Sequence, residues 1–206
     1  MQNEEGWCGW RSPFHLPRAW AARRAFVDGL RTRYDGSLDA LNAAWGAGWR
    51  SWDHLAAFHA RDNPPGLTAR GEADCDAFLG AFADRFWGAV AASLRAADPT
   101  HLFLGCRFLA LPPHPALAAA LGRHADVVSI NWYMWYKQTM NDIAPFLDRW
   151  HALTGRPLLI SEWAFELSDA RGLAARVLCA DPAARAAQSA EFARRCLAHP
   201  AVVGMH

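Results

Sequence analysis

Short apolar runs alternate with stretches of helical spacing through the second half of the chain. The apolar runs cover 101–106, 126–133, 157–163 and 201–206. Runs of this length with no polar alternation are typical of parallel strands that are buried on both faces. Helical patterns separate them over 115–123, over 141–153 and from Asp181-Pro182 to about Leu197. The order predicts a parallel sheet with covering helices.

Two architectures fit such an order: an open doubly wound sheet and a (β/α)₈ barrel. No glycine-rich phosphate loop follows any of the apolar runs, which argues against a nucleotide-binding open sheet. Asn141 is the expected N-cap of the middle helix, and Gly155 is expected to end it. We therefore expect an α/β fold of the barrel type.

The first half of the chain has mainly helical spacing. Apolar residues recur on one side of 18–34, and Ser37 is placed to cap a second helix that Gly46 ends. A loop through 63–66 then leads to a long helix with phenylalanines at four-residue spacing. Long connections at the C-terminal face of a barrel commonly shape the substrate site. Trp45 and Trp49 are expected to have structural roles in this connection.

Composition narrows the class of partner. The chain has 206 residues, of which 52% are hydrophobic, so one sizeable core is expected. The formal net charge is +1 with both signs mixed, which indicates neither a nucleic-acid partner nor an acidic surface. Eleven tryptophans are many for this length, and several fall in predicted loops or at strand ends. Indole rings at strand ends commonly line ligand clefts and stack on sugar rings.

The cysteines and the chain start bear on location and on metals. The five cysteines have irregular spacing and no CxxC pair, so a zinc ribbon and a disulfide framework are not expected. The nine histidines show neither HxH nor HExxH spacing, so we expect no metal site and no cofactor. The first residues contain no apolar signal region and no run spans a membrane, so a cytoplasmic location is the default expectation.

Two glutamates are the candidate catalytic groups. Glu162 ends the apolar run 157–163, and Glu4 follows Asn3 near the chain start. A lone glutamate at a strand end often only reaches solvent or pairs with an arginine. In a barrel, however, the C-terminal strand ends carry the catalytic groups. Cleavage of a glycosidic bond requires two carboxyl groups, which lie about 5–5.5 Å apart in retaining enzymes.

These two positions resemble the catalytic motifs of the clan A retaining glycoside hydrolases. Asn3-Glu4 is similar to the clan's acid/base motif at the end of strand four, and Ser161-Glu162-Trp163 to its nucleophile motif at the end of strand seven. The resemblance implies that the four apolar runs are strands five to eight. It also implies a double-displacement mechanism in which Glu4 is the acid/base and Glu162 the nucleophile.

Within that clan, the first half is most similar to the family 42 β-galactosidases and their agarase-like relatives. The similar stretch is Tyr34–Gly46 (YDGSLDALNAAWG), which continues to Ser51-Trp52. The resemblance implies hydrolysis of β-linked galactosides or related oligo- and polysaccharides. It also implies that a carbohydrate is the substrate, with no nucleic-acid or membrane partner.

The resemblance and the strand ends together suggest the residues that contact substrate. Asn3 is expected to contact the sugar 2-hydroxyl, and Tyr133 to hydrogen-bond the nucleophile. Arg107 is expected either to bind a sugar hydroxyl or to pair with an acid. The full set of predicted substrate-binding residues is Asn3, Trp7, Arg107, Asn131, Trp132, Tyr133, Trp163 and His206.

The family's barrel needs eight strands, and the runs found here account only for the edge of strand four and strands five to eight. We therefore expect a single incomplete catalytic barrel: the strand-four end and helical connection over 1–97, and strands five to eight over 98–206. An open half-barrel exposes unpaired strand edges and an apolar inner face. We therefore expect the fold to need either the missing half-barrel or self-association for its stability. The isolated chain is expected to have little or no activity.

Two other interpretations remain open at the level of the sequence. The first is a non-catalytic carbohydrate-binding remnant that has kept a tryptophan-lined cleft. A Glu4–Glu162 carboxyl separation beyond about 10 Å would favour it. The second is an unrelated α/β protein such as a metal-dependent hydrolase, which the histidine spacing disfavours.

Overall fold

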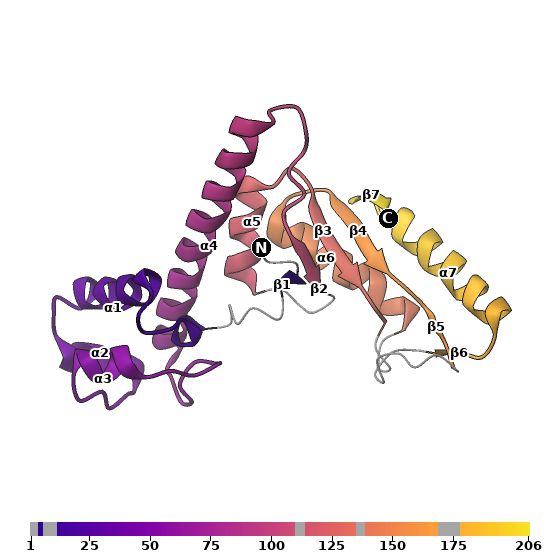
Figure 1. The fold of residues 1–206 in the computed structure, drawn as a ribbon. Helices are drawn as coiled ribbons and strands as arrows, with labels where there is room; N and C mark the ends of the chain where they lie inside the picture. The colour runs from indigo at the N-terminus through magenta and orange to yellow at the C-terminus, as the bar shows by residue number, and fades with distance from the viewer. Residues whose placement is uncertain (1–3, 6–11, 110–113, 135–138, 169–177) are drawn as a thin grey trace. The chain divides into compact units, whose positions relative to one another are not determined.

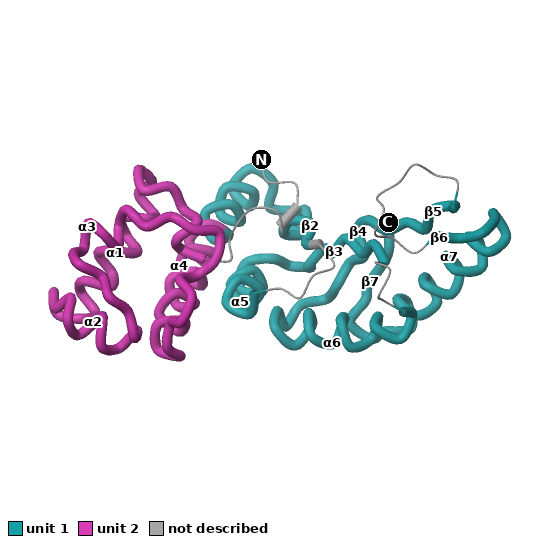
Figure 2. Tube along the Cα trace, turned by 90° about the horizontal axis from the view of Figure 1, so that it is seen from below, with its two compact units in different colours: residues 1–6, 87–206 teal, residues 7–86 magenta. Residues whose placement is uncertain are grey.

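The computed structural model describes residues 4–5, 12–109, 114–134, 139–168 and 178–206. Asn3 and Trp7, two of the predicted substrate-binding residues, lie outside these ranges. The chain forms two compact units (Figure 2): residues 1–6 with 87–206, here called the sheet unit, and residues 7–86, here called the helical unit. The boundary between the two units lies inside one long helix, α4 (Ala69–Ala97).

The sheet unit is built on five strands that all run parallel, in the order β1-β2-β3-β4-β7 (Figure 1). A second, two-stranded parallel sheet pairs β5 with β6. The strands are β1 (Glu4–Glu5), β2 (Arg107–Leu109), β3 (Val128–Trp132), β4 (Leu158–Trp163), β5 (Glu166–Leu167), β6 (Leu178–Cys179) and β7 (Val202–Met205).

Three of the four apolar runs form strands where they were predicted, and the run 101–106 does not. The paired strand at that place begins only at Arg107. Gly105 has a φ of +70°, a left-handed conformation that interrupts an extended chain. The preceding residues still approach β3, because the Phe103 carbonyl accepts from the Asp126 N–H at 2.9 Å and the Leu104 carbonyl from the Ser129 N–H at 3.2 Å.

Three helices alternate with these strands: α5 (Pro115–His124), α6 (Ile143–Thr154) and α7 (Pro182–Leu197). Asn141 was the expected N-cap of α6, and this was wrong. It lies inside a short 3₁₀ helix, Met140–Asp142, whose capping box is formed by Thr139 and Asp142. Gly155 ends α6 as predicted, with a φ of +63°.

The helices pack against one face of the sheet, as Figures 1 and 2 both show. Aromatic pairs mark this layer: Phe108 of β2 lies 4.9 Å from Trp150 of α6, between ring centroids. Trp163 of β4 lies 5.2 Å from Phe192 of α7 by the same measure. A doubly wound sheet would carry helices on both faces. Within the described ranges the other face of this sheet has no helix, and it carries the polar side chains described below.

The helical unit contains α1 (Ala21–Arg33), α2 (Leu38–Trp45), α3 (Trp52–Ala57) and the first part of α4, preceded by a 3₁₀ turn, Pro13–His15. Ser37 and Gly46 bound α2 as predicted. Helix α3 was not predicted. The Ser51 hydroxyl caps it by accepting from the His54 N–H at 3.0 Å, so a capping signal was present. At six residues, α3 is too short for a clear apolar period.

The buried carboxylate of Asp74 ties the helices of this unit together. It accepts from the Tyr34 hydroxyl at 2.5 Å, from the Trp45 indole N–H at 3.0 Å and from the guanidinium of Arg33. Burial alone would raise the pKa of Asp74, but the hydrogen bonds from Tyr34, Trp45 and Arg33 outweigh it and hold the pKa below its ordinary value. The ends of the Tyr34–Gly46 stretch therefore have a structural role.

The thiols of Cys75, Cys179 and Cys196 are buried and free, and Cys106 is half-buried. Burial raises the pKa of the Cys196 thiol to about 12, and burial also raises that of Cys75. No helix among the described residues is long and apolar enough to cross a bilayer.

Candidate active site

A β-bulge in β4 determines which face of the sheet Glu162 occupies. Ile160 pairs with Ile130 of β3, but the next pair is Asn131 with Glu162, so Ser161 is an extra residue in the ladder. Side chains alternate between faces along a strand. Without the extra residue, Glu162 would pair with Trp132 and share its helix-covered face. The bulge places Glu162 beside Asn131 on the face without helices.

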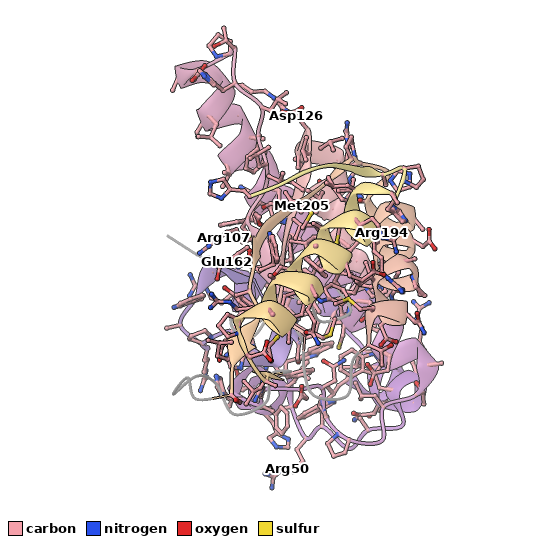
Figure 3. All side chains as sticks on the ribbon, turned by 90° about the vertical axis from the view of Figure 1, so that its right-hand side faces the viewer. Arg50, Arg107, Asp126, Glu162, Arg194 and Met205 are labelled. Carbon is pink, nitrogen blue, oxygen red and sulfur yellow. The ribbon has the colours of Figure 1, made fainter. Side chains whose placement is uncertain are left out.

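Three side chains donate hydrogen bonds to the Glu162 carboxylate: Arg107 begins β2, Asn131 lies in β3, and Tyr133 directly follows β3. The Tyr133 hydroxyl donates to Oε1. The Arg107 guanidinium donates to Oε2 and forms an ion pair with it (Figure 3). The Asn131 amide donates to the same oxygen at 3.3 Å. The side chains of Glu162 and Arg107 are 34% and 33% exposed, so solvent or a ligand can reach the pair.

Ser161 holds the amide of Asn131 in one orientation. Its hydroxyl donates to Oδ1 of Asn131 at 3.0 Å. With its oxygen engaged in this way, the amide turns its NH₂ group toward Glu162. Asn131 is fully buried and Ser161 is half-buried, so both are fixed by their surroundings. Ser161 was included in the predicted nucleophile motif but was given no function of its own. Its hydroxyl, in an otherwise apolar strand, was the feature that could have indicated a polar contact.

The predicted residues separate onto the two faces of the sheet. Arg107, Asn131, Tyr133 and Glu162 come together. Trp132, only 2% exposed, packs instead on Phe146 of α6 at a centroid distance of 4.3 Å. Trp163 pairs with Trp132 across the ladder, on the helix-covered face. This placement favours packing roles for the two tryptophans over contact with a substrate.

The remaining predicted residues lie at the edges of the described sheet. The backbone of Glu4 in β1 is in register with that of Arg107 in β2. Its side chain lies outside the described atoms, so the separation between the Glu4 and Glu162 carboxylates stays a prediction. His206 follows β7, where its N–H donates to the Ile160 carbonyl at 2.9 Å and its side chain is exposed.

This arrangement can hold a carboxylate in a defined orientation at an accessible strand end. One cation and two neutral donors fix both oxygens of Glu162, as a nucleophile or an electrostatic group requires. Within the described ranges no group of three or more His, Cys, Asp or Glu side chains gathers where it could hold a metal ion.

Comparison with known proteins identifies two β-agarases among the relatives of this chain. No family model matches the chain. It is 30% identical to β-agarase A of Vibrio sp. (strain JT0107) over 90% of this chain and 18% of that protein. It is 27% identical to β-agarase B of the same strain, over 72% of this chain and 15% of that protein. The chain thus spans under a fifth of the length of these curated relatives.

Solved structures give the same indication. The chain superposes on an exo-β-agarase with a TM-score of 0.73 and 25% identity, covering 94% of this chain and 26% of that one. A second agarase structure gives a TM-score of 0.71 at the same identity and coverage. A β-galactosidase from Bacillus circulans sp. alkalophilus shares the fold, at 17% identity and a TM-score of 0.55.

These similarities support the expectation that the chain corresponds to a segment of a glycoside hydrolase. The relatives named above that share 25% or more of their residues with this chain are agarases, whereas the β-galactosidase shares only the fold. The specific resemblance to family 42 β-galactosidases is therefore not supported.

Proposed function

We propose that this chain carries the nucleophile half of a retaining glycoside hydrolase that acts on β-linked galactans of the agar type. The observation that carries the proposal is the Glu162 carboxylate, held at the end of a parallel strand by Arg107, Asn131 and Tyr133. The similarity of nearly the whole chain to agarases supports the substrate class.

In the proposed reaction, one oxygen of Glu162 attacks the anomeric carbon while the glycosidic bond to the leaving sugar breaks. The leaving oxygen takes a proton from the acid/base, which we assign to Glu4. A water then gives its proton back to that residue and attacks the same carbon, which frees Glu162 and completes retention. Donors that hold both Glu162 oxygens before the reaction reduce the reorganisation that the attack requires.

The proposal includes a closed (β/α)₈ barrel in the complete protein. In such a barrel the helices cover the outer face of the parallel sheet, and the functional side chains lie on the inner side. The sheet unit has the same arrangement, with helices on one face and polar groups on the other. Strands β2, β3, β4 and β7 would then be strands five to eight, and β1 the end of strand four. The strands before β1 would be supplied by a longer polypeptide or by another chain, so the isolated segment is expected to have little or no activity.

The test replaces the nucleophile in a protein that completes the barrel. Glu162→Gln should lower kcat on agar oligosaccharides by at least about 10⁴-fold, since the covalent step is lost. Glu72→Gln, at an exposed glutamate of the helical unit, is the matched control and should retain full activity.

Azide distinguishes a nucleophile from a residue that only binds sugar. In Glu162→Gly, azide can occupy the vacated space and attack the anomeric carbon of an aryl β-galactoside, so an α-glycosyl azide and the released phenol should form. Wild-type activity in Glu162→Gln would overturn the assignment. Binding of agar oligosaccharides without hydrolysis by the completed wild-type barrel would favour a non-catalytic carbohydrate-binding protein.

A further inference from the structure

A groove of about 290 Å³ lies between α1 and α3, built wholly from the helical unit. Its charged lining is arginine-rich, with two aspartates among the cations. These charged residues are Arg18, Arg23, Arg24, Asp28, Arg31 and Asp53. The site around Glu162 uses none of them. Four guanidinium groups around one cavity predict a site that attracts oxyanions.

Arg23 places a buried positive charge in the lining of this groove, with its guanidinium over the rings of Phe14 and Phe26, 4.6 and 5.5 Å from their centroids. Its side chain is fully buried and donates to the carbonyls of Pro13, Leu55 and Phe58. No carboxylate among the described residues forms an ion pair with it, and its Nε has no hydrogen-bond partner there. Burial lowers the pKa of Arg23 to about 10, because the buried guanidinium has lost contact with water. An anion in the groove would offset that charge.

Arg31 lies over an aromatic ring at the edge of the groove. Its guanidinium lies over the Trp52 ring, 5.3 Å from the centroid. The indole N–H of Trp52 donates to the Gly36 carbonyl at 3.3 Å, which fixes the ring. A guanidinium stacked on an aromatic face keeps its N–H edge available for bidentate bonding to a sulfate or carboxylate. Arg24 and Arg31 lie seven positions apart on α1, so they point to the same side of the helix.

The two aspartates of the groove add acceptors beside these donors. Neither Asp28 nor Asp53 forms an ion pair with an arginine among the described residues, although both line the same cavity as four of them. Their oxygens are therefore available to accept from hydroxyl groups. Donors for an oxyanion beside acceptors for hydroxyls match a sugar that carries one anionic substituent.

We propose that this groove binds an acidic saccharide unit, with the arginines on its sulfate or carboxylate group and the aspartates on its hydroxyls. The polysaccharide origin of that unit rests on the proposed function, whereas the affinity for the oxyanion does not. The groove then acts as a binding site for substituted polysaccharide in addition to the strand-end site.

Titration calorimetry on the 206-residue chain at constant ionic strength tests the proposal, with three probes. A sulfated galactan oligosaccharide should bind at least about 10-fold more tightly than the neutral oligosaccharide of equal length. Inorganic sulfate should bind more weakly than the sulfated oligosaccharide and compete with it. Equal affinity for sulfated and neutral oligosaccharides would overturn the proposal. If inorganic sulfate binds as tightly as the sulfated oligosaccharide, the claim that the groove recognises a saccharide is overturned.

Substitutions locate the binding. The double variant Arg24→Gln/Arg31→Gln should weaken binding of the sulfated oligosaccharide at least 10-fold, because both side chains are exposed contributors to the groove. Asp53→Asn should weaken binding of the sulfated oligosaccharide but should not weaken binding of inorganic sulfate. Arg50→Gln is the matched control and should change nothing, because it removes an exposed charge (Figure 3) at a residue that does not line the groove. Unchanged binding by the folded double variant would overturn the proposal.

The readout is independent of hydrolysis. Glu162→Gln should bind the sulfated oligosaccharide in this groove as tightly as the wild type, since Glu162 belongs to the sheet unit. Selective binding without any hydrolysis by the completed wild-type barrel would therefore count against the proposed enzyme and not against this site. Hydrolysis with no selective binding would count against this site alone.

Discussion

Ser161 donates its hydroxyl to Oδ1 of Asn131, and the same amide donates through Nδ2 to Glu162. Ser161 is also the extra residue of the β-bulge that places Glu162 on the face of Asn131. One residue thus sets both the face of the carboxylate and the orientation of a group that binds it. Such coupling ties the geometry around Glu162 to the backbone, since the bulge moves only if the ladder on both sides moves.

The hydroxyl of Ser161 is expected to act on turnover rather than on stability. In a completed barrel, Ser161→Ala should lower kcat on agar oligosaccharides about 10-fold, because the amide loses the partner that orients it, with KM little changed. Ser129→Ala is the control: its hydroxyl donates to the Cys106 carbonyl at 3.1 Å and contributes about 1 kcal/mol of stability, with no contact to Glu162. Equal kcat values for both variants would contradict the role of Ser161.

The two tyrosines with carboxylate partners should differ in what they support. Tyr133→Phe removes the donor to Oε1 of Glu162 and should lower kcat about 10- to 100-fold in a completed barrel, with stability nearly unchanged. Tyr34→Phe removes the donor to Asp74 and should lower the free energy of unfolding by about 1–2 kcal/mol, with kcat unchanged. Steady-state kinetics and urea unfolding of both variants test whether Tyr133→Phe mainly lowers kcat and Tyr34→Phe mainly lowers the free energy of unfolding.

Asp74 makes the helical unit sensitive to acid. Its folded-state pKa lies below the unfolded value of about 3.9. The stability that it contributes is therefore fully present above about pH 5, and it is lost as pH falls through the folded-state pKa. Asp74→Asn should lower the free energy of unfolding at pH 7 by about 2–4 kcal/mol, since it leaves buried donors poorly matched.

Unfolding in urea between pH 7 and pH 2 measures this contribution. The stability difference between wild type and Asp74→Asn should shrink as the pH falls. A difference that stays constant over the whole range would show that Asp74 contributes no charge-dependent stability.

Gly122 permits the close contact of α5 with the end of α6. A Cβ built at this position would lie 2.1 Å from the Thr154 carbonyl oxygen, which is backbone and cannot rotate away. Gly122→Ala should therefore destabilise the sheet unit by about 3 kcal/mol or more. Gly29→Ala in α1, where nothing lies within 4 Å of the added carbon, should instead stabilise by about 0.5–1 kcal/mol. Thermal unfolding of both variants tests the contrast.

The sequence was informative wherever local chemistry determines the structure. Helix α7 begins at Pro182 and ends at Leu197 as expected, because Asp181 caps it and proline favours the first turn. The parallel strands β3, β4 and β7 follow from apolar runs that only a covered sheet can bury. The hydrogen bond between Tyr133 and Glu162, which the family resemblance implied, is present.

The sequence was uninformative where the structure depends on contacts between strands. The bulge at Ser161 exists only in the pairing of β3 with β4, and neither strand indicates it alone. For that reason Trp132 was assigned to the same edge as Asn131, although it faces the helices. The left-handed Gly105 likewise interrupts a run that looks continuous by composition.

The buried thiols offer a way to follow each unit separately during unfolding. Cys75 lies in the core of the helical unit and Cys196 in that of the sheet unit, and both are almost fully buried. Raised pKa values and burial keep both thiols unreactive until their surroundings open. Timed alkylation followed by peptide mass measurement would give two separate rates. These rates would report whether helix α4, which both units share, forces them to open together.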